Sequence, residues 1–446
     1  MITNEEIALA THCLAFALEN GASGVRITLS KSLMNLVGML NGEVDKTAHA
    51  LDKSLQLQLF VNGRFGTFSS NRLEKDELES FILQAIDTVK MLEEDKFRSL
   101  PDPSRLAKDA VTGQELGLWD ATAESLTSVR RKELAISSSF WSRKAEAEKG
   151  FTLIAEEGEY SDSIFDSVTM DSQGLFARHT ETSFEIGYEA TVQDSEGNHY
   201  SNYWWDAAPF LKDLQLESCA QKACLRAAQA ISPVSIDSCR TNLIVDSECA
   251  GKLVTPLLNA LGGFAVQQKN SFLADKLGKK LFPDSLSIID LPRVPGETGC
   301  RLFDSEGVAT RELPVIENGV VKTFFINTYI GHKMGVEPTI EDATRVKLMP
   351  FGGCSTQEEL LQKMIDGILV TGFNGGNSNA ATGNFSYGIE GFLIRGGRKV
   401  HPVREMLITG DFISLWNNLV ATANDARPCL SKLIPTLAFK DVSFSA

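Results

Sequence analysis

The sequence lacks the short motifs that identify several enzyme classes. No two of its six histidines lie within five residues of each other, so it has no His-x₃-His zinc helix. It has no GxSxG stretch, the signature of the nucleophile elbow of serine hydrolases. Its eight cysteines form no CxxC pair. No apolar run approaches the length of a membrane span.

Negative charge also exceeds positive charge. The formal net charge is −15, and no cluster of Lys and Arg is interleaved with aromatic residues. Proteins that bind nucleic acids usually carry such a basic patch. We therefore expect no nucleic-acid partner.

The beginning of the chain, MITNEEIALA, carries early acids and lacks the basic region of a signal peptide. Scattered cysteines in a chain of this size are typical of reduced thiols in the cytosol. We therefore expect the protein to be cytoplasmic. We also expect that it does not bind a membrane.

The N-terminal part shows a helix followed by strands. Residues 3–20 have a helical pattern, and Thr3 with Glu6 makes a possible capping box. Alternating strand-like runs then meet at Asn41-Gly42 and Asn62-Gly63. Asn-Gly between two such runs is a strong hairpin signal. This region is predicted to be an antiparallel meander.

The pattern continues with helices and longer strands up to a proline. Residues 151–194 alternate as strands do. Apolar spacing predicts further helices over 78–92, 121–140 and 213–231. Asp213 is the expected N-cap of the third helix.

Ser232-Pro233 is the expected domain boundary. We predict an α+β protein of two domains. The first, 1–230, combines helices with an antiparallel meander. The second, 231–446, is rich in antiparallel strands and contains a hairpin turning at Asn318-Gly319.

A glycine-rich stretch, Thr371–Gly388, permits three interpretations. It lacks the Gly-Lys-Ser/Thr ending of a P-loop and opens no obvious helix. It is also consistent with a long loop between strands, in which glycine supplies positive φ. The third interpretation is a loop that faces a substrate.

The stretch SECAGKLVTPLLNALGG, residues 247–263, follows a short apolar strand at 243–245. Its apolar residues recur at helical spacing and indicate a core helix. Asp246 and Glu248 are explained by the positive end of the helix dipole. Cys300 and Cys429 are candidate nucleophiles only if a histidine lies beside them, and the buried, inert thiol is the favoured interpretation.

Taken together, the segments resemble the TldD/PmbA family, also called "putative modulators of DNA gyrase", over nearly the whole chain. The resemblance rests on the order and spacing of several blocks. They are NGEVDKTAHALDKSLQLQLFVNGRFGTFSSN with LPDPS, MDSQGL, FLADKLGKKLF, RLFDSEGVATRELPVIENGVVKTFFINTYIGHKMG and TGNFSYGIEGFLIRGGRKVHPVREMLITGDFISLWNNLVATAND.

The resemblance implies one of two branches. TldD-like members look like metallopeptidases with an HExxxH helix and a distant Cys ligand, in which the metal activates water and the Glu accepts its proton. PmbA/TldE-like members lack that motif and resemble the metal-free partner in a protease of unfolded peptides.

The helix 247–263 places this chain in the second branch. The family motif follows an Ala-Gly-x-Leu-x lead-in, here AGKLV, so its first His, its Glu and its second His fall on Thr255, Pro256 and Ala260. None of these residues ligates a metal in the family's manner. Pro256 either kinks the helix or starts a new one with Thr255 as its N-cap. No ligand role is carried over to Cys429, and no metal or other cofactor is expected.

Three functional hypotheses follow from the resemblance. The first is a metal-free subunit that completes the substrate channel of a TldD-like metallopeptidase in a heterodimer, without hydrolysing peptides alone. The second is a homodimeric peptide-binding or regulatory protein without catalysis. The third is a peptidase that uses a non-metal nucleophile, for instance Cys300 or Cys429. Four residues of the glycine-rich stretch are candidates for the channel wall: Asn374, Asn377, Asn384 and Tyr387.

Overall fold

The computed structural model describes residues 1–446 and divides into two compact units, each discontinuous in sequence. Unit 1 comprises Met1–Leu225, Arg293–Thr310 and Asn327–Ile340. Unit 2 comprises Arg226–Pro292, Arg311–Ile326 and Glu341–Ala446. Each combines helices with a mostly antiparallel sheet, which confirms the predicted α+β class. No helix is long and apolar enough to cross a membrane.

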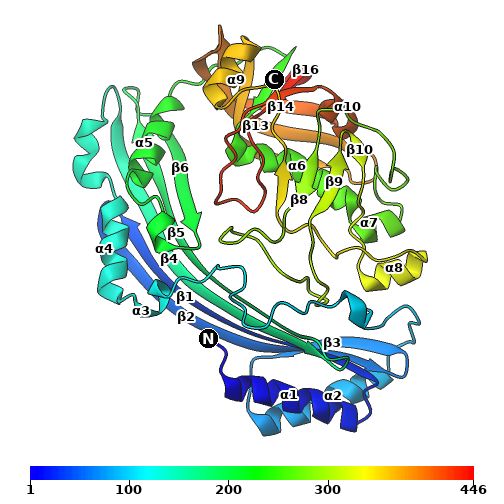
Figure 1. The fold of residues 1–446 in the computed structure, drawn as a ribbon. Coiled ribbons are helices and arrows are strands. Elements are labelled where there is room, and N and C mark those ends of the chain that lie inside the picture. The colour runs from blue at the N-terminus through cyan, green and yellow to red at the C-terminus, as the bar shows by residue number, and fades with distance from the viewer. The chain divides into compact units, whose positions relative to one another are not determined.

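Unit 1 is built on a six-stranded antiparallel sheet of order β3-β2-β1-β4-β5-β6 (Figure 1). Its strands are β1 Gly24–Leu40, β2 Glu43–Val61, β3 Arg64–Ser70, β4 Thr152–Asp171, β5 Phe176–Gln193 and β6 His199–Ala208. Its helices are α1 Asn4–Glu19, α2 Lys75–Lys90, α3 Thr122–Ser125, α4 Ser128–Ser138 and α8 Thr328–Met334, and α5 Cys219–Gln229 crosses into unit 2.

Helices α1 and α2 cover the β1–β3 end of this sheet. Ala10, Cys13 and Ala17 of α1 and the apolar stripe of α2 pack in one buried cluster with odd-numbered side chains of β1 and β2. Thr3 and Glu6 form the predicted capping box at the start of α1. A cap of this kind stabilises a helix by about 1 kcal/mol.

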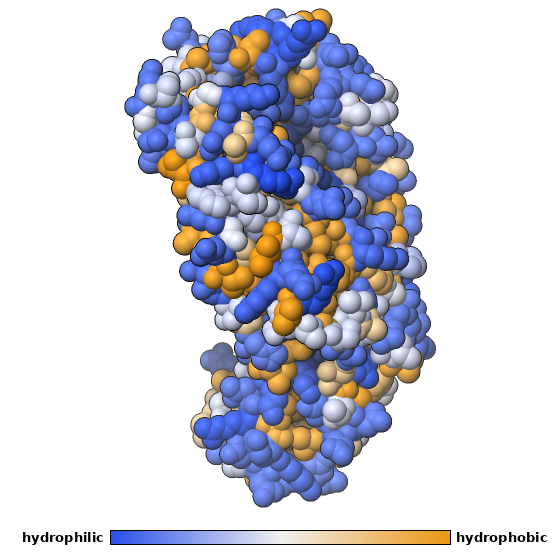
Figure 2. Space-filling model, turned by 90° about the vertical axis from the view of Figure 1, so that its left-hand side faces the viewer, coloured by the Kyte–Doolittle hydropathy of each residue, from blue (hydrophilic) through white to orange (hydrophobic).

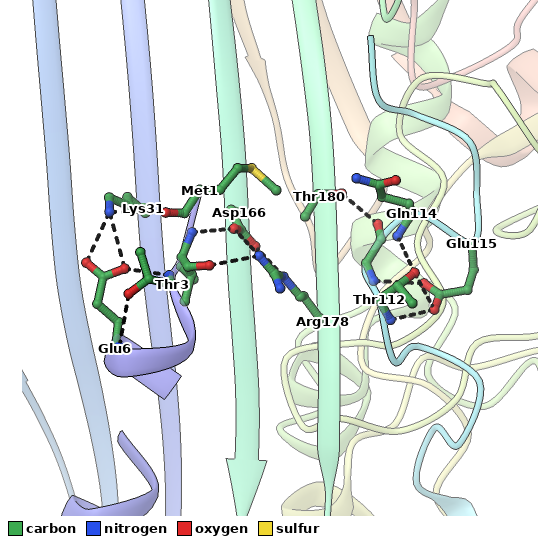
Figure 3. Close-up of polar contacts among 12 residues, drawn as sticks. Met1, Thr3, Glu6, Lys31, Thr112, Gln114, Glu115, Asp166, Arg178 and Thr180 are labelled. Carbon is green, nitrogen blue, oxygen red and sulfur yellow. Dashed lines mark hydrogen bonds and ion pairs between the residues drawn. The ribbon is translucent and has the colours of Figure 1, made fainter. Parts of the chain in front are cut away.

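The first residues of the chain are held by the same sheet (Figure 3). Asp166 on β4 accepts from the backbone N–H of Ile2 at 2.6 Å, and Arg178 on β5 donates to the Ile2 carbonyl at 3.1 Å. Arg178 also pairs with Asp166 at 2.7 Å, and the Asp166 side chain is fully buried. Lys31 on β1 donates to the carbonyl of Met1 and to Glu6.

Unit 2 contains a ring of strands and a small second sheet. The larger sheet has the order β14-β13-β12-β7-β16-β15, and β14 also pairs with β16, which closes the ring. Its strands are β7 Cys239–Val245, β12 Gly367–Ser378, β13 Asn384–Arg395, β14 Arg398–Asp411, β15 Leu419–Thr422 and β16 Leu437–Ser445. The small sheet joins β8 Ile288–Asp290, β9 Leu313–Glu317, β10 Val320–Val321 and β11 Val346–Leu348. The helices are α6 Ser247–Leu261, α7 Gly263–Gln267, α9 Gln357–Met364 and α10 Phe412–Asn417.

Two predicted helices differ from the structure. The helix expected over 121–140 is split into α3 and α4, because Leu126 is extended and Thr127 caps α4 by accepting from Arg130. The helix expected from Asp213 begins only at Cys219. Asp213 is instead the last residue of a 3₁₀ turn, so it is not the N-cap.

The glycine-rich stretch Thr371–Gly388 is mostly strand, not the long loop that we considered. It forms the hairpin of β12 and β13 with a turn at 379–383. Two register shifts interrupt the pairing, and Gly375 and Gly376 have φ of 147° and 90°. A side chain at position 376 would collide with the carbonyl oxygen of Ser386, which explains why glycine is needed there. Such shifts are common at strand edges.

Candidate functional site

Helix α6 lies at the centre of the candidate site in unit 2. It follows β7 directly, and Asp246 caps its first turn by accepting from the N–H of Glu248 at 2.9 Å. Its buried side chains are the predicted apolar stripe, including Leu253, Val254 and Leu257. The interpretation of the stretch as a core helix is therefore confirmed.

Pro256 lies inside α6 without ending it. It has no N–H to donate to the carbonyl of Lys252, four residues earlier. The Thr255 hydroxyl donates to the Gly251 carbonyl at 2.9 Å, which is the bond of a residue within a helix and not of an N-cap. Of the two sequence-based alternatives, a kink or a new helix with Thr255 as its N-cap, the structure excludes the new helix.

The three positions aligned with the metal motif carry no ligand set. Thr255 and Pro256 are half-buried and Ala260 is buried. In the structure, no group of three or more His, Cys, Asp or Glu side chains is placed to hold a metal ion. The donor chemistry at these positions, one hydroxyl and no imidazole or carboxylate, does not fit a zinc site.

An ionic cluster surrounds the first turn of α6. Glu248 lies 2.9 Å from Arg226 and 3.5 Å from Arg427. Burial raises the pKa of Glu248 even though Arg226 counteracts it. Burial also raises the pKa of the Cys249 thiol well above its ordinary value, so this thiol is protonated at neutral pH.

A second set of polar contacts ties this turn to α9 and to the segment before β16. Gln357 on α9 donates to the Asp246 carboxylate at 2.8 Å and to the Thr436 hydroxyl at 3.4 Å. Thr436 donates to Asp425 from both its backbone N–H and its hydroxyl, at 2.7 and 2.6 Å. The contacts of Glu248 and Asp246 could not be predicted from the sequence, because their partners lie far along the chain. The dipole explanation of the two acids accounts for only part of their role.

A cation–π contact is one of the contacts that join the hairpin β12–β13 to α6. The ammonium group of Lys252 lies 5.2 Å from the centroid of the Tyr387 ring. Tyr387 is buried and stacks on Phe385 at 5.5 Å, and Phe385 lies 4.9 Å from Phe412. Of the four predicted channel residues, Tyr387 therefore belongs to the packed interior beside α6.

The other three predicted residues lie on the exposed part of the hairpin. Asn374 and Asn377 are on β12 and Asn384 begins β13, and all three are exposed. The turn between the strands is held from both sides, because Phe272 donates to the Ala380 carbonyl and Phe412 to the Gly383 carbonyl, each at 3.0 Å. The asparagines thus project from an anchored hairpin, and their role in binding stays a prediction.

The two candidate cysteine nucleophiles differ in access. Cys300 is fully buried in a cluster with Leu302 and Phe303, so a peptide cannot reach its sulfur. Cys429 is half-buried in the segment between β15 and β16.

This fold and this helix belong to a known class of proteins. The chain matches the PmbA/TldA metallopeptidase family in three parts: domain 1 over residues 25–88, the central domain over 130–231 and the C-terminal domain over 238–446. The chain belongs to the PmbA/TldD family, as the resemblance predicted.

Individual relatives are similar along their full length. Metalloprotease PmbA of Escherichia coli O157:H7 is 26% identical over 95% of this chain and 94% of its own. A crystal structure from Bacteroides thetaiotaomicron, described as a "putative modulator of DNA gyrase", is 36% identical, covers 100% of both chains and superposes with a TM-score of 0.95. TldE from Thermococcus kodakarensis has the same fold, with a TM-score of 0.84 at 20% identity over 98% of this chain and 100% of its own.

Proposed function

We propose that this chain is the metal-free subunit of a two-chain peptidase. In this assembly, a TldD-like partner supplies the HExxxH metal site and this chain completes the substrate channel. The observation that carries the proposal is the composition of α6, in which Thr255, Pro256 and Ala260 occupy the positions of the family's two histidines and glutamate. A family fold without its catalytic ligands is well suited to a supporting role.

The substrate would be an extended, unfolded peptide. Strand β12 pairs with β7 only over Ile368–Val370, while its distal half, Gly372–Ser378, has β13 as its one strand partner. A peptide that adds to such an edge binds through its backbone, which tolerates many sequences. Asn374 and Asn377 lie on this half of β12 and would contact the added strand.

A peptidase assay with each chain alone and with both together tests the proposal. We expect casein hydrolysis to need the TldD-like chain and to rise at least fivefold when this chain is added. Elemental analysis should find zinc in the partner and not in this chain. Casein hydrolysis by this chain alone, or one equivalent of zinc in it, would contradict the proposal. If this chain alone hydrolysed casein and the substitution Cys429→Ala abolished that activity, the cysteine-peptidase hypothesis would be supported instead.

Substitutions on β12 test the channel wall separately. Asn374→Arg and Asn377→Arg place a long charged side chain on the exposed strand, so we expect each to reduce the stimulation of hydrolysis at least threefold. Asn71→Arg, also at an exposed asparagine but in unit 1, is the matched control and should retain full stimulation. If all three variants stimulated hydrolysis equally, β12 would not line the substrate channel.

A further inference from the structure

Two lysines lie beside α6, the helix of the candidate site. Lys252 is exposed on the helix itself. Lys432 belongs to the segment between β15 and β16 and is half-buried. Its Cδ atom lies 4.0 Å from the point where the Cβ atom of a side chain at position 251 would be, so Gly251 leaves room for the stem of Lys432 on the helix. The two lysines therefore meet α6 at successive residues.

Thr255 lies one turn further along the same helix. Residues three and four apart are neighbours on a helix surface, so Thr255 adjoins both Gly251 and Lys252. The Thr255 hydroxyl donates to the Gly251 carbonyl at 2.9 Å, which turns this side chain toward the place where Lys432 meets the helix. The two lysines thus lie next to the position that the family motif gives to its first histidine.

Neither of these ammonium groups is paired with a carboxylate. Lys252 contacts an aromatic ring, and neither Lys252 nor Lys432 forms an ion pair. The acidic side chains at the start of α6 have other partners, since Glu248 pairs with two arginines and Asp246 accepts from α9. The chain as a whole has 58 acidic and 43 basic side chains, so two neighbouring ammonium groups without a counterion are a local excess of positive charge. Such an excess attracts an anionic ligand.

The hairpin β12–β13 places Lys252 at the level of the proposed channel wall. The ammonium group of Lys252 lies 5.2 Å from the centre of the Tyr387 ring on β13. Tyr387 pairs with Gly376 on β12, which stands between Asn374 and Asn377. Helix α6 also packs against β12 itself. Because neighbouring strands lie only about 4.8 Å apart, a peptide added to β12 would pass close to the lysine side chain.

The chemistry of the two lysines suits one particular group of a peptide. An ammonium group donates up to three hydrogen bonds and accepts none, so it matches a carboxylate. The C-terminal carboxylate is the one anionic group that every unmodified peptide carries at neutral pH. Its recognition depends on no side chain, which agrees with backbone pairing along β12. On the face that Figure 2 shows, hydrophobic side chains gather in small groups among hydrophilic ones, so that face offers an unfolded peptide no large apolar patch instead.

We propose that Lys252 and Lys432 bind the C-terminal carboxylate of the peptide. The proposal rests on the proposed function, because it takes a peptide on β12 as the ligand. It adds an orientation to that function, since the C-terminal end of the peptide is then held at α6. An Asp or Glu side chain carries the same chemical group and has to be distinguished from the chain end by experiment.

Peptide binding to this chain alone, without its TldD-like partner, tests the proposal by fluorescence anisotropy. The probe is a short labelled peptide without Asp or Glu, made with a free C-terminal carboxylate or with a C-terminal amide. We expect the carboxylate form to bind about fivefold more tightly, the range of exposed ion pairs. The preference should fall as salt is added, because salt screens exposed charges. A third peptide, amidated and with one internal Glu, should bind like the amide.

Substitution of the lysines shows whether they cause the preference. Lys252→Met and Lys432→Met keep an unbranched stem and remove the charge, so each should reduce the preference and the double variant should abolish it. Lys252→Glu should make the amide form the tighter ligand, a reversal that damage to the fold would not produce. The double variant Lys279→Met and Lys440→Met, at exposed lysines elsewhere in unit 2, is the matched control and should retain the preference.

Several results would overturn the proposal. The parent chain could bind both forms equally or bind neither, or the double variant at 252 and 432 could keep the preference. Equal affinity for the free carboxylate and for the internal Glu would assign the lysines to acidic side chains instead of the chain end. The proposed function has a separate readout. Stimulation of casein hydrolysis without a carboxylate preference would refute this site alone, and a preference without stimulation would refute the subunit role alone.

Discussion

The ammonium group of Lys252 on α6 lies 5.2 Å from the centre of the Tyr387 ring on β13. The contact joins the helix that lacks the metal ligands to the hairpin that carries the candidate channel residues. Tyr387 is 2% exposed and therefore cannot turn away from this position without unpacking its aromatic neighbours. The orientation of the hairpin is thus coupled to α6.

A double-mutant cycle measures this coupling. Lys252→Met keeps the aliphatic stem and removes the charge, so it should lower the free energy of unfolding by about 0.5–1 kcal/mol, the range of a cation–π contact at a partly exposed site. Tyr387→Leu should cost about 3 kcal/mol because it removes a buried ring. The double variant should be less destabilised than the sum by about 0.5 kcal/mol or more. Additive effects would show that the two side chains do not interact.

Replacing the proline inside α6 should stabilise unit 2. Pro256→Ala restores a donor for the Lys252 carbonyl and removes a helix-interior penalty of about 3 kcal/mol. Greater freedom of the unfolded chain offsets about 1 kcal/mol of this gain. The net effect, about 1–2 kcal/mol, should raise the Tm in a thermal scan by several degrees.

Pro295→Ala is the matched control, since Pro295 is exposed in a loop and its loss acts only on the unfolded chain. Its Tm should stay the same or fall. A fall in Tm for Pro256→Ala would mean that the proline ring contributes packing that outweighs the missing hydrogen bond.

Because of Glu156, the stability of unit 1 should decrease as the pH rises. Its carboxylate is buried and accepts from Ser139 and from the N–H of Phe140, and burial raises its pKa above the ordinary value. The folded protein therefore binds this proton more tightly than the unfolded chain. The resulting stability is fully present below about pH 4.3, the unfolded pKa, and is lost as the pH rises through the folded pKa.

Chemical denaturation from pH 4 to 8 checks this behaviour. Glu156→Gln removes the titration and should flatten the decrease, whereas Glu157→Gln, at the exposed neighbour, should leave the pH profile unchanged. Identical profiles for Glu156→Gln and the parent would contradict the prediction.

Local signals in the sequence predicted much of the fold. The Asn-Gly turns, the capping box of α1 and the alternation over β4 and β5 each depend on neighbouring residues and were confirmed. The errors arose where a local pattern was ambiguous. Thr127 interrupts a helical pattern by capping a new helix, and glycines in β12 occupy register shifts that resemble a loop in the sequence alone.

The candidate site was less accessible to sequence reasoning. The resemblance identified the positions Thr255, Pro256 and Ala260, because a motif is a local pattern. It did not reveal that Lys252 contacts Tyr387, or that Arg226 and Arg427 flank Glu248 from distant parts of the chain. Such contacts depend on tertiary packing, which no single spacing encodes.

Asp166 should anchor the start of the chain to the sheet of unit 1. Its fully buried carboxylate accepts from Ile2 and from two nitrogens of Arg178. Asp166→Asn preserves the shape but leaves Arg178 without its counterion, and breaking a buried pair in this way costs about 3 kcal/mol. Asp87→Asn, which breaks an exposed pair with Lys90, should change the free energy of unfolding by less than about 0.5 kcal/mol.

Hydrogen exchange distinguishes an anchoring role from a general loss of stability. In Asp166→Asn one amide oxygen replaces the two carboxylate oxygens that accept from Ile2 and Arg178, so the segment before α1 should exchange faster than the global unfolding rate predicts. Adding Arg178→Gln removes the unpaired charge and should recover part of the stability without restoring protection at Ile2. If protection at Ile2 were retained in Asp166→Asn, one side-chain oxygen would be enough to hold the backbone of Ile2, and the anchor would not depend on the carboxylate charge.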